Sequence, residues 1–304
     1  MRLIQLISLL VLITITPSTI PADQQAEPRQ ITPSIPEPNE LVDSKNPTTE
    51  DLELGWRAYK GGNYAESLNR YLAAVEAAPT DVSIWYDLGC VYVMNQDTPK
   101  ARKAFEHALQ LNPKFASALD ALGQLDEIEG HTDRAQEAYA TAVGLEPANA
   151  KFLRHRIRVL LLLNNADEAR QTIQQLLSRA PTDTEARYEL GILELRAKAY
   201  ELAIHDFQHV VDHSPQHAMA WNGLGVSYAH LGDFEHATSA LQHAVTLEPN
   251  NAYTQNNLGL VAAYQQHWEK ARAAWKRALA IDPNCRSAIK NIQTLDATQP
   301  TSTP

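Results

Sequence analysis

The chain of 304 residues carries a formal net charge of −10 at pH 7, so a nucleic-acid phosphate backbone is not expected as its main ligand. Hydrophobic residues make up 44% of the chain, which is enough for an extended core. The 12 glycines and 5 phenylalanines suit helices better than a β-barrel or a β-sandwich.

The first segment, residues 1–22, is predicted to be a secretory signal peptide. A single positive charge at Arg2 precedes an apolar run, residues 3–15, that is too short for a comfortable transmembrane helix. Cleavage is expected after Ala22, with Thr16-Pro17-Ser18 as the competing site. An uncleaved N-terminal anchor is the alternative, because the positive charge at its start is weak. The chain is therefore expected to be exported, and to be periplasmic or associated with a cell envelope.

Residues 23–47 are predicted to form a disordered linker. The segment is rich in Pro, Gln, Glu, Thr and Ser, and such a composition favours an extended chain that buries no apolar surface. The linker would hold the rest of the protein away from the membrane or the export machinery.

From residue 48 to residue 285 the sequence repeats every 34 residues without an insertion, which predicts a repeat architecture. One proline ends each repeat: Pro79, Pro113, Pro147, Pro181, Pro215, Pro249 and Pro283. A second column is glycine, with Ile157 as the exception: Gly55, Gly89, Gly123, Gly191, Gly225 and Gly259. Sixteen positions after each member of that column stands a bulky residue: Tyr71, Phe105, Tyr139, Ile173, Phe207, Leu241 and Trp275. A small residue lets two helices approach and a large one fills the facing hole, so each repeat is predicted to be a pair of packed helices.

These residues and spacings closely resemble the tetratricopeptide repeat. The resemblance implies an all-α fold, a right-handed superhelical α-solenoid of helix-turn-helix repeats, and a protein-binding scaffold as the function. It covers seven repeats: 48–81, 82–115, 116–149, 150–183, 184–217, 218–251 and 252–285. Four first helices are predicted to begin after a short polar residue that caps the free N–H groups: Asp81, Asn149, Asp183 and Asn251.

After the repeats, residues 286–296 are predicted to form a capping helix, because a solenoid needs a polar-faced terminal helix for solubility. Residues 297–304 are predicted to be a disordered tail. The two cysteines, Cys90 and Cys285, fall in the second repeat and at the end of the seventh, so no intramolecular disulfide is expected.

No catalytic signature is present in the sequence. There is no Gly-rich phosphate loop ending in Lys-Ser/Thr, no His-Glu-x-x-His, no Cys-x-x-Cys and no Gly-x-Ser-x-Gly. The protein is therefore expected not to be an enzyme and to use no cofactor, no metal and no small-molecule substrate. Its expected partners are protein or peptide segments, and self-association through the linker or the terminal helix of another copy is a further alternative.

In the tetratricopeptide family the first helix of each repeat lines a concave groove, notably through repeat positions 2, 5, 9, 12 and 13. Transferred to this sequence, these positions give a groove that is aromatic at its start, charged in its middle, and apolar with two asparagines at its end. Such a groove suits an extended or helical peptide, with the asparagines able to hold the peptide backbone. The predicted groove residues are Leu52, Trp56, Tyr59, Tyr86, Met94, Gln124, Arg154, Arg158, Tyr188, Asn222, Tyr253, Asn256 and Tyr264.

Arg154 and Arg158 are four residues apart on one helix face, and the hypothesis is that they meet an acidic side chain or a C-terminus of the partner. The alternative is that Asp120 and Glu127 of the neighbouring repeat neutralise them. Arg156 stands in a column of leucines, which indicates either an ion-pair or partner site, or a long side chain that reaches water.

A stripe of histidines offers a second hypothesis for function. His205, His209 and His213 repeat every four residues on one predicted helix face, and His243 takes the position of His209 in the next repeat. This spacing can bind zinc, nickel or copper. The alternative is a solvated histidine face. The function predicted from the sequence is thus an exported scaffold or adaptor in envelope complex assembly, with a metal- or pH-responsive binding protein as the alternative.

Overall fold

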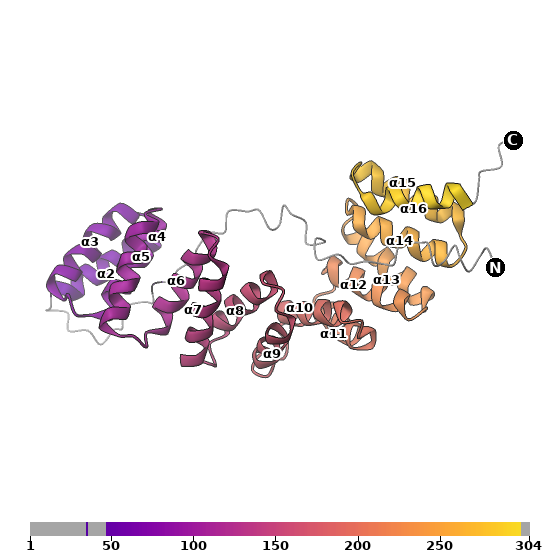
Figure 1. Cartoon of the computed structure of the whole chain (residues 1–304). Helices are drawn as coiled ribbons and strands as arrows, with labels where there is room; N and C mark the ends of the chain where they lie inside the picture. The colour runs from indigo at the N-terminus through magenta and orange to yellow at the C-terminus, as the bar shows by residue number, and fades with distance from the viewer. Residues whose placement is uncertain (1–34, 36–46, 299–304) are drawn as a thin grey trace. The chain divides into compact units, whose positions relative to one another are not determined.

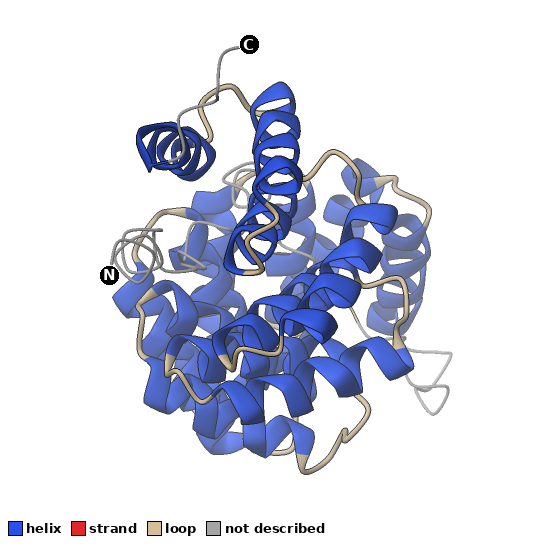
Figure 2. Ribbon diagram, turned by 90° about the vertical axis from the view of Figure 1, so that its right-hand side faces the viewer, coloured by secondary structure: helices blue, strands red, loops and turns tan. Residues whose placement is uncertain are grey.

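The computed structural model describes Ile35 and residues 47–298, and all regular secondary structure among these residues is helical (Figures 1 and 2). The predicted signal peptide and nearly all of the predicted linker lie outside the described residues. None of the described helices is long and apolar enough to cross a membrane.

The described chain forms two compact units. The N-terminal unit holds Ile35 and the first eight helices: α2 (Pro47–Lys60), α3 (Tyr64–Ala77), α4 (Val82–Met94), α5 (Thr98–Leu111), α6 (Ala116–Ile128), α7 (Thr132–Leu145), α8 (Ala150–Leu162) and α9 (Ala166–Leu177). The C-terminal unit holds the other seven: α10 (Thr184–Arg196), α11 (Tyr200–His213), α12 (Ala218–His230), α13 (Phe234–Leu247), α14 (Ala252–Tyr264), α15 (Trp268–Ile281) and α16 (Arg286–Thr298). Within each unit every helix packs against the next one along the chain, so the all-α fold of successive helix pairs is as predicted.

Two details differ from the sequence-based expectation. α16 continues to Thr298, so residues 297 and 298 are helical where the disordered tail was predicted to begin. Ile35 lies within the predicted linker, yet only 6% of its surface is exposed. The composition of the linker averages over residues and therefore missed one apolar side chain that the folded part encloses.

The glycine column and the bulky column meet inside each helix pair. A Cβ atom placed on Gly89 would lie 2.4 Å from Cε1 of Phe105, and one on Gly259 would lie 2.5 Å from Nε1 of Trp275. Both distances are far shorter than a van der Waals contact, so the first helix can approach the second only where the side chain is missing. The repeat that carries Ile157 uses the smaller Ile173 opposite it, and both are buried. In this repeat two side chains of intermediate size thus replace the combination of a glycine and a bulky residue.

Polar side chains cap the starts of many of the described helices, although α6, α7, α11 and α15 have no such cap. The predicted caps are confirmed: a carbonyl or carboxylate oxygen of Asp81, Asn149, Asp183 and Asn251 accepts a backbone N–H of the first turn that follows. Four second helices are capped in the same way by residues that the sequence analysis did not single out: Asn63, Asp97, Asn165 and Asp233. The polar cap therefore recurs at both helix starts of the repeat.

The turn between the two helices of every repeat contains one residue in the left-handed region. The seven residues recur every 34 positions, with φ between 56° and 81°: Gly62, Gln96, Gly130, Asn164, Lys198, Gly232 and Gln266. Glycine adopts this conformation freely, whereas glutamine and lysine adopt it at a cost. Each turn thus has the same geometry, whichever residue occupies it.

Candidate protein-binding site

Aromatic side chains gather on the first helices of the first two repeats. Tyr86 is buried, with its ring centroid 5.6 Å from that of Phe105 and 5.5 Å from that of Phe115. Leu52, Trp56 and Tyr59 are partly buried against the same cluster. We call the surface formed by Leu52, Trp56, Tyr59, Tyr86 and Asp87 the aromatic face. Met94, also predicted for the groove, is partly exposed at the end of α4.

The aromatic face also contains polar atoms that have no partner. Among the residues that the structure describes, Nε1 of Trp56, Oδ1 of Asp87 and the hydroxyl of Tyr71 are shielded from solvent and have no hydrogen-bond partner. Burial raises the pKa of the Asp87 carboxyl well above its usual range, and the charge of Asp81 adds to the shift. Burial also raises the pKa of Tyr59 to about 12. A buried donor and a buried acceptor without partners are costly, and a ligand that binds both would remove that cost.

Asp87 was missed by the sequence analysis. It occupies repeat position 6, which is not among the family's groove positions, and the periodic pattern says nothing of a single carboxylate in an otherwise apolar helix. One feature of the sequence could have pointed to Asp87: it is the only charged residue in α4, VSIWYDLGCVYVM.

The middle of the predicted groove is filled by contacts within the N-terminal unit. Gln124 is buried and donates to Oδ2 of Asp120 at 2.8 Å, while Nδ1 of His155 lies 2.6 Å from Oδ1 of that carboxylate. Arg158 donates twice to Glu127, through Nε to Oε1 at 2.9 Å and through Nη2 to Oε2 at 2.6 Å. Of the two interpretations of the arginine pair, neutralisation by Glu127 is therefore the one found for Arg158.

The two other arginines of α8 differ from Arg158. Arg154 is exposed on the helix. Arg156 donates from Nη2 to Oε2 of Glu168 at 3.0 Å, and 22% of its side chain is exposed. The departure from leucine at this position is thus matched by an acidic residue on α9, as the ion-pair interpretation predicted.

In the C-terminal unit the predicted groove residues form two groups. Tyr188 and Tyr264 are partly buried and pack on rings of the same unit, with centroids 5.8 Å from Phe207 and 5.5 Å from Phe234, respectively. Tyr253 is the most exposed of the predicted aromatic residues in this unit, at 36%. Its ring is therefore available to a partner.

The second group is a chain of buried asparagines, which we call the asparagine ladder: Asn222, Asn257, Asn256 and Asn291. Asn257 donates to Asn222 at 3.0 Å, and Asn291 donates to Asn256 at 3.0 Å. All four are at most 9% exposed. The two that were predicted to hold a peptide backbone, Asn222 and Asn256, thus use their amide oxygens on neighbouring helices. Asn257 and Asn291 were not anticipated, because each lies 35 residues after its partner, one residue more than the period of the repeat.

Sequence profiles of the tetratricopeptide repeat match residues 52–115, 128–190, 188–252 and 252–285, which together cover most of the chain. The chain belongs to the tetratricopeptide repeat family. The matched ranges 52–115 and 252–285 correspond to whole helix pairs of the structure, α2 to α5 and α14 to α15.

The relatives of this tetratricopeptide repeat protein include an assembly protein, a subunit of a complex and an organizing protein. It is 31% identical over 123 residues to the photosystem I assembly protein Ycf3 of Rippkaea orientalis, covering 40% of this chain and 70% of the relative. It is 24% identical over 144 residues to anaphase-promoting complex subunit 3 of Schizosaccharomyces pombe, with coverage of 47% and 22%. It is 25% identical over 130 residues to Hsp70-Hsp90 organizing protein 3 of Arabidopsis thaliana, with coverage of 43% and 23%. The chain thus spans under a quarter of the length of these last two.

Solved structures share the fold. YrrB, described as a tetratricopeptide repeat protein with an unusual peptide-binding site, superposes with a TM-score of 0.57 at 22% identity, over 60% of this chain and 95% of YrrB. The C-terminal part of a repeat protein from Cytophaga hutchinsonii superposes with a TM-score of 0.60 at 20% identity, over 78% and 98%.

The histidine stripe of this tetratricopeptide repeat protein does not converge on a common point. His209 and His213 stack on each other with centroids 4.2 Å apart, whereas His243 stacks on Trp221 at 4.7 Å. His205 lies 3.3 Å from Oδ1 of Asp206. Trp221 is itself held by a hydrogen bond from its Nε1 to a backbone carbonyl of the preceding repeat. His243 therefore has a packing role against a fixed ring.

Across the described residues, one group of three metal-ligating side chains comes within 4.8 Å, and it lies outside the histidine stripe: Asp126, Glu129 and His131. Nη2 of Arg102 donates to both carboxylates of this group, at 2.8 and 2.9 Å. A guanidinium therefore occupies the place that a cation would take.

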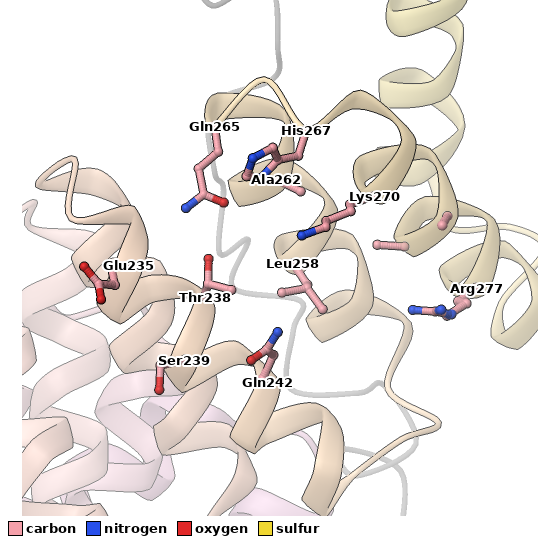
Figure 3. A pocket seen from close by; sticks show the side chains of 12 residues that line it. Glu235, Thr238, Ser239, Gln242, Leu258, Ala262, Gln265, His267, Lys270 and Arg277 are labelled. Atoms are coloured by element: carbon pink, nitrogen blue, oxygen red, sulfur yellow. The ribbon is translucent and has the colours of Figure 1, made fainter.

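A hollow of about 680 Å³ lies among α13, α14 and α15 (Figure 3). Its rim carries both signs of charge, with Glu235 on α13 and Lys270 and Arg277 on α15. Leu258 and Ala262 line it from a different side of α14 than the predicted groove positions. The hollow is thus separate from the predicted groove.

Proposed function

We propose that the protein is an exported protein-binding scaffold of envelope complexes, and that its aromatic face receives an extended segment of a partner protein. The observation that carries the proposal is the pair of unpartnered buried polar atoms, Nε1 of Trp56 and Oδ1 of Asp87, set among aromatic and aliphatic side chains. A peptide supplies what this surface lacks, because its side chains are apolar at intervals while its backbone offers both N–H donors and C=O acceptors.

The chemistry of the surface indicates how the segment binds. Trp56 donates to a backbone carbonyl of the segment, and Asp87 accepts a backbone N–H. The rings of Tyr59 and Tyr86 lie against an apolar side chain of the segment. Aromatic residues of this kind bury much area at a small cost in side-chain entropy, and they dominate the energy of many interfaces.

The names of the relatives support a protein partner over a small molecule. Ycf3 is named for the assembly of photosystem I, the Arabidopsis relative for organizing Hsp70 and Hsp90, and YrrB for a peptide-binding site. What these proteins have in common with this chain is the repeat, and their particular partners are not transferred to it. The class of ligand, a segment of another protein, is what we transfer.

Export is proposed from the apolar segment after Arg2 and from the Pro-rich segment that follows it. N-terminal sequencing of protein recovered from a bacterial periplasm tests this part. A chain that begins at Asp23 supports a cleaved signal peptide. A full-length chain in the membrane fraction supports the uncleaved anchor instead, and a full-length chain in the cytoplasm would refute export.

The binding site is tested by quantitative affinity capture from the envelope fraction. The variant Trp56→Ala with Asp87→Asn removes an aromatic side chain and a buried carboxyl group from the aromatic face. The loss of one such central aromatic residue typically costs about 2 kcal/mol or more, which is roughly thirty-fold in affinity. A matched control is Leu202→Ala, because Leu202 is 57% exposed on α11 and does not belong to the aromatic face.

The expected result is that specific partners are lost from the double variant but kept by the control, with both proteins equally helical by circular dichroism. Equal recovery of the same partners with all three proteins would show that the aromatic face is not the binding site.

A further inference from the structure

Ile35 is separated from α2 by residues 36–46, yet it is as buried as a core residue. With 6% of its surface exposed, it belongs to the hydrophobic cluster of the N-terminal unit that contains Tyr86 and Cys90. Leu52 and Trp56 of the aromatic face pack against the same cluster. An isoleucine from outside the repeats therefore belongs to the same hydrophobic cluster as Tyr86, against which the other apolar side chains of the aromatic face pack.

The local sequence favours such a role. Ile35 stands in Pro33-Ser34-Ile35-Pro36, and a residue that precedes proline is biased towards an extended backbone. An isoleucine presented on a backbone that is already restricted loses less conformational entropy when it is buried. It therefore has the character of a peptide ligand with one aliphatic anchor.

We propose that Ile35 is an intramolecular ligand of the aromatic face, and that it holds the place that an aliphatic residue of a partner segment takes. The inference rests on the proposed function, because it concerns the same surface. It further defines the partner: the segment carries a β-branched aliphatic residue, and the partner must displace Ile35 in order to bind.

Tethering sets how strongly Ile35 competes. Only residues 36–46 separate Ile35 from α2, so the chain between them can span at most about 40 Å. A short tether of this kind gives an effective concentration on the order of 1 mM. Suppose that the segment around Ile35 binds the aromatic face with a Kd on the order of 100 µM. An effective concentration of about 1 mM then keeps the face about ten-fold more often occupied than vacant. A free peptide of the same sequence would therefore bind the wild-type protein about ten-fold more weakly than a protein whose face is vacant.

The test uses a fluorescein-labelled peptide with the sequence of residues 31–40, ITPSIPEPNE, and fluorescence anisotropy with the full chain. Three proteins are compared: the wild type, Ile35→Ala and the matched control Ile31→Ala, which removes an isoleucine from the same segment. We expect Ile35→Ala to bind the peptide about ten-fold more tightly than the wild type, and Ile31→Ala to bind like the wild type. A peptide with aspartate in place of Ile35 should bind none of them.

Equal affinity of the wild type and Ile35→Ala for the peptide would overturn the proposal, and so would an absence of binding to Ile35→Ala. A second arm measures molar mass by light scattering. A wild-type dimer that becomes monomeric in Ile35→Ala would also overturn it, because Ile35 would then occupy the face of a second copy.

Failure of this inference is distinguishable from failure of the proposed function. If the peptide does not compete but Trp56→Ala with Asp87→Asn still loses its partners, the aromatic face binds proteins and Ile35 does not regulate it. If the peptide competes as expected but partner capture is unchanged in the double variant, Ile35 covers a surface that partners do not use.

Discussion

Replacing Gly89 by alanine tests the packing principle of the whole repeat. The new Cβ would lie 2.4, 2.6 and 2.9 Å from three ring atoms of Phe105, whose side chain is fully buried. Overpacking of this kind costs about 1–3 kcal/mol. Alanine recovers about 0.5–1 kcal/mol, because glycine is a poor helix former. The expected net loss of unfolding free energy is therefore about 1 kcal/mol, within a range of roughly 0–2.5 kcal/mol.

Two further proteins make the prediction specific. Gly144→Ala is the matched control, because Gly144 lies in α7 with no atom within 4 Å of its added Cβ, and it should stabilise by about 0.5 kcal/mol. The double variant Gly89→Ala with Phe105→Ile replaces the ring opposite the new Cβ by an isoleucine, the residue that position 173 carries in the repeat of Ile157. It should be no less stable than Phe105→Ile alone, which gives a coupling energy of about 1 kcal/mol or more.

The assay is urea unfolding followed by circular dichroism, together with hydrogen exchange of peptides from α4 and α5. Faster exchange in α4 and α5 is expected for Gly89→Ala and not for Gly144→Ala. The argument would be refuted if Gly89→Ala were as stable as Gly144→Ala, or if Phe105→Ile failed to relieve its effect.

Two other predictions follow from the C-terminal unit. Burial, and next the charge of Glu185, raise the pKa of Glu189 from 4.5 to about 7, so the folded state holds this proton to a higher pH than the unfolded chain. The free energy of unfolding should then fall by up to about 3 kcal/mol as pH rises from 4.5 to about 7. Melting temperatures measured across this pH range should show the fall in the wild type and not in Glu189→Gln. An identical pH profile for the variant would contradict this. Lys198 has φ 62°, so Lys198→Gly should stabilise by about 0.5 kcal/mol, whereas Gly232→Ala, at the equivalent turn with φ 80°, should destabilise by about 1 kcal/mol. If both variants shifted the thermal midpoint in the same direction, the account of the turns would be wrong.

The sequence predicted the helix pairs because the repeat makes each structural requirement visible several times. Gly89 alone would be ambiguous, but its column together with the column of Phe105 identifies a close approach of two helices. The cap residues were predictable for the same reason, since Asp81 and Asn149 need only the backbone that follows them.

Contacts between repeats were much less predictable. Asp120 and His155 are 35 residues apart. The 34-residue repeat also allows other pairings at a similar spacing, so the sequence alone does not single out this one. The pairing of Arg158 with Glu127 was only one of two alternatives for the same reason. Ile35 was missed because composition describes a segment as a whole, whereas burial is decided by single side chains.

An array of similar helix pairs could also stack in a wrong order, because an apolar surface accepts many apolar neighbours. The asparagine ladder counteracts this in the C-terminal unit. If α14 were shifted or exchanged for another first helix, Asn222 and Asn291 would be left buried with unsatisfied amides, at a cost of about 1–3 kcal/mol each. The amide pairs thus act as a check on assembly: they add little to the stability of the correct order but penalise the incorrect ones.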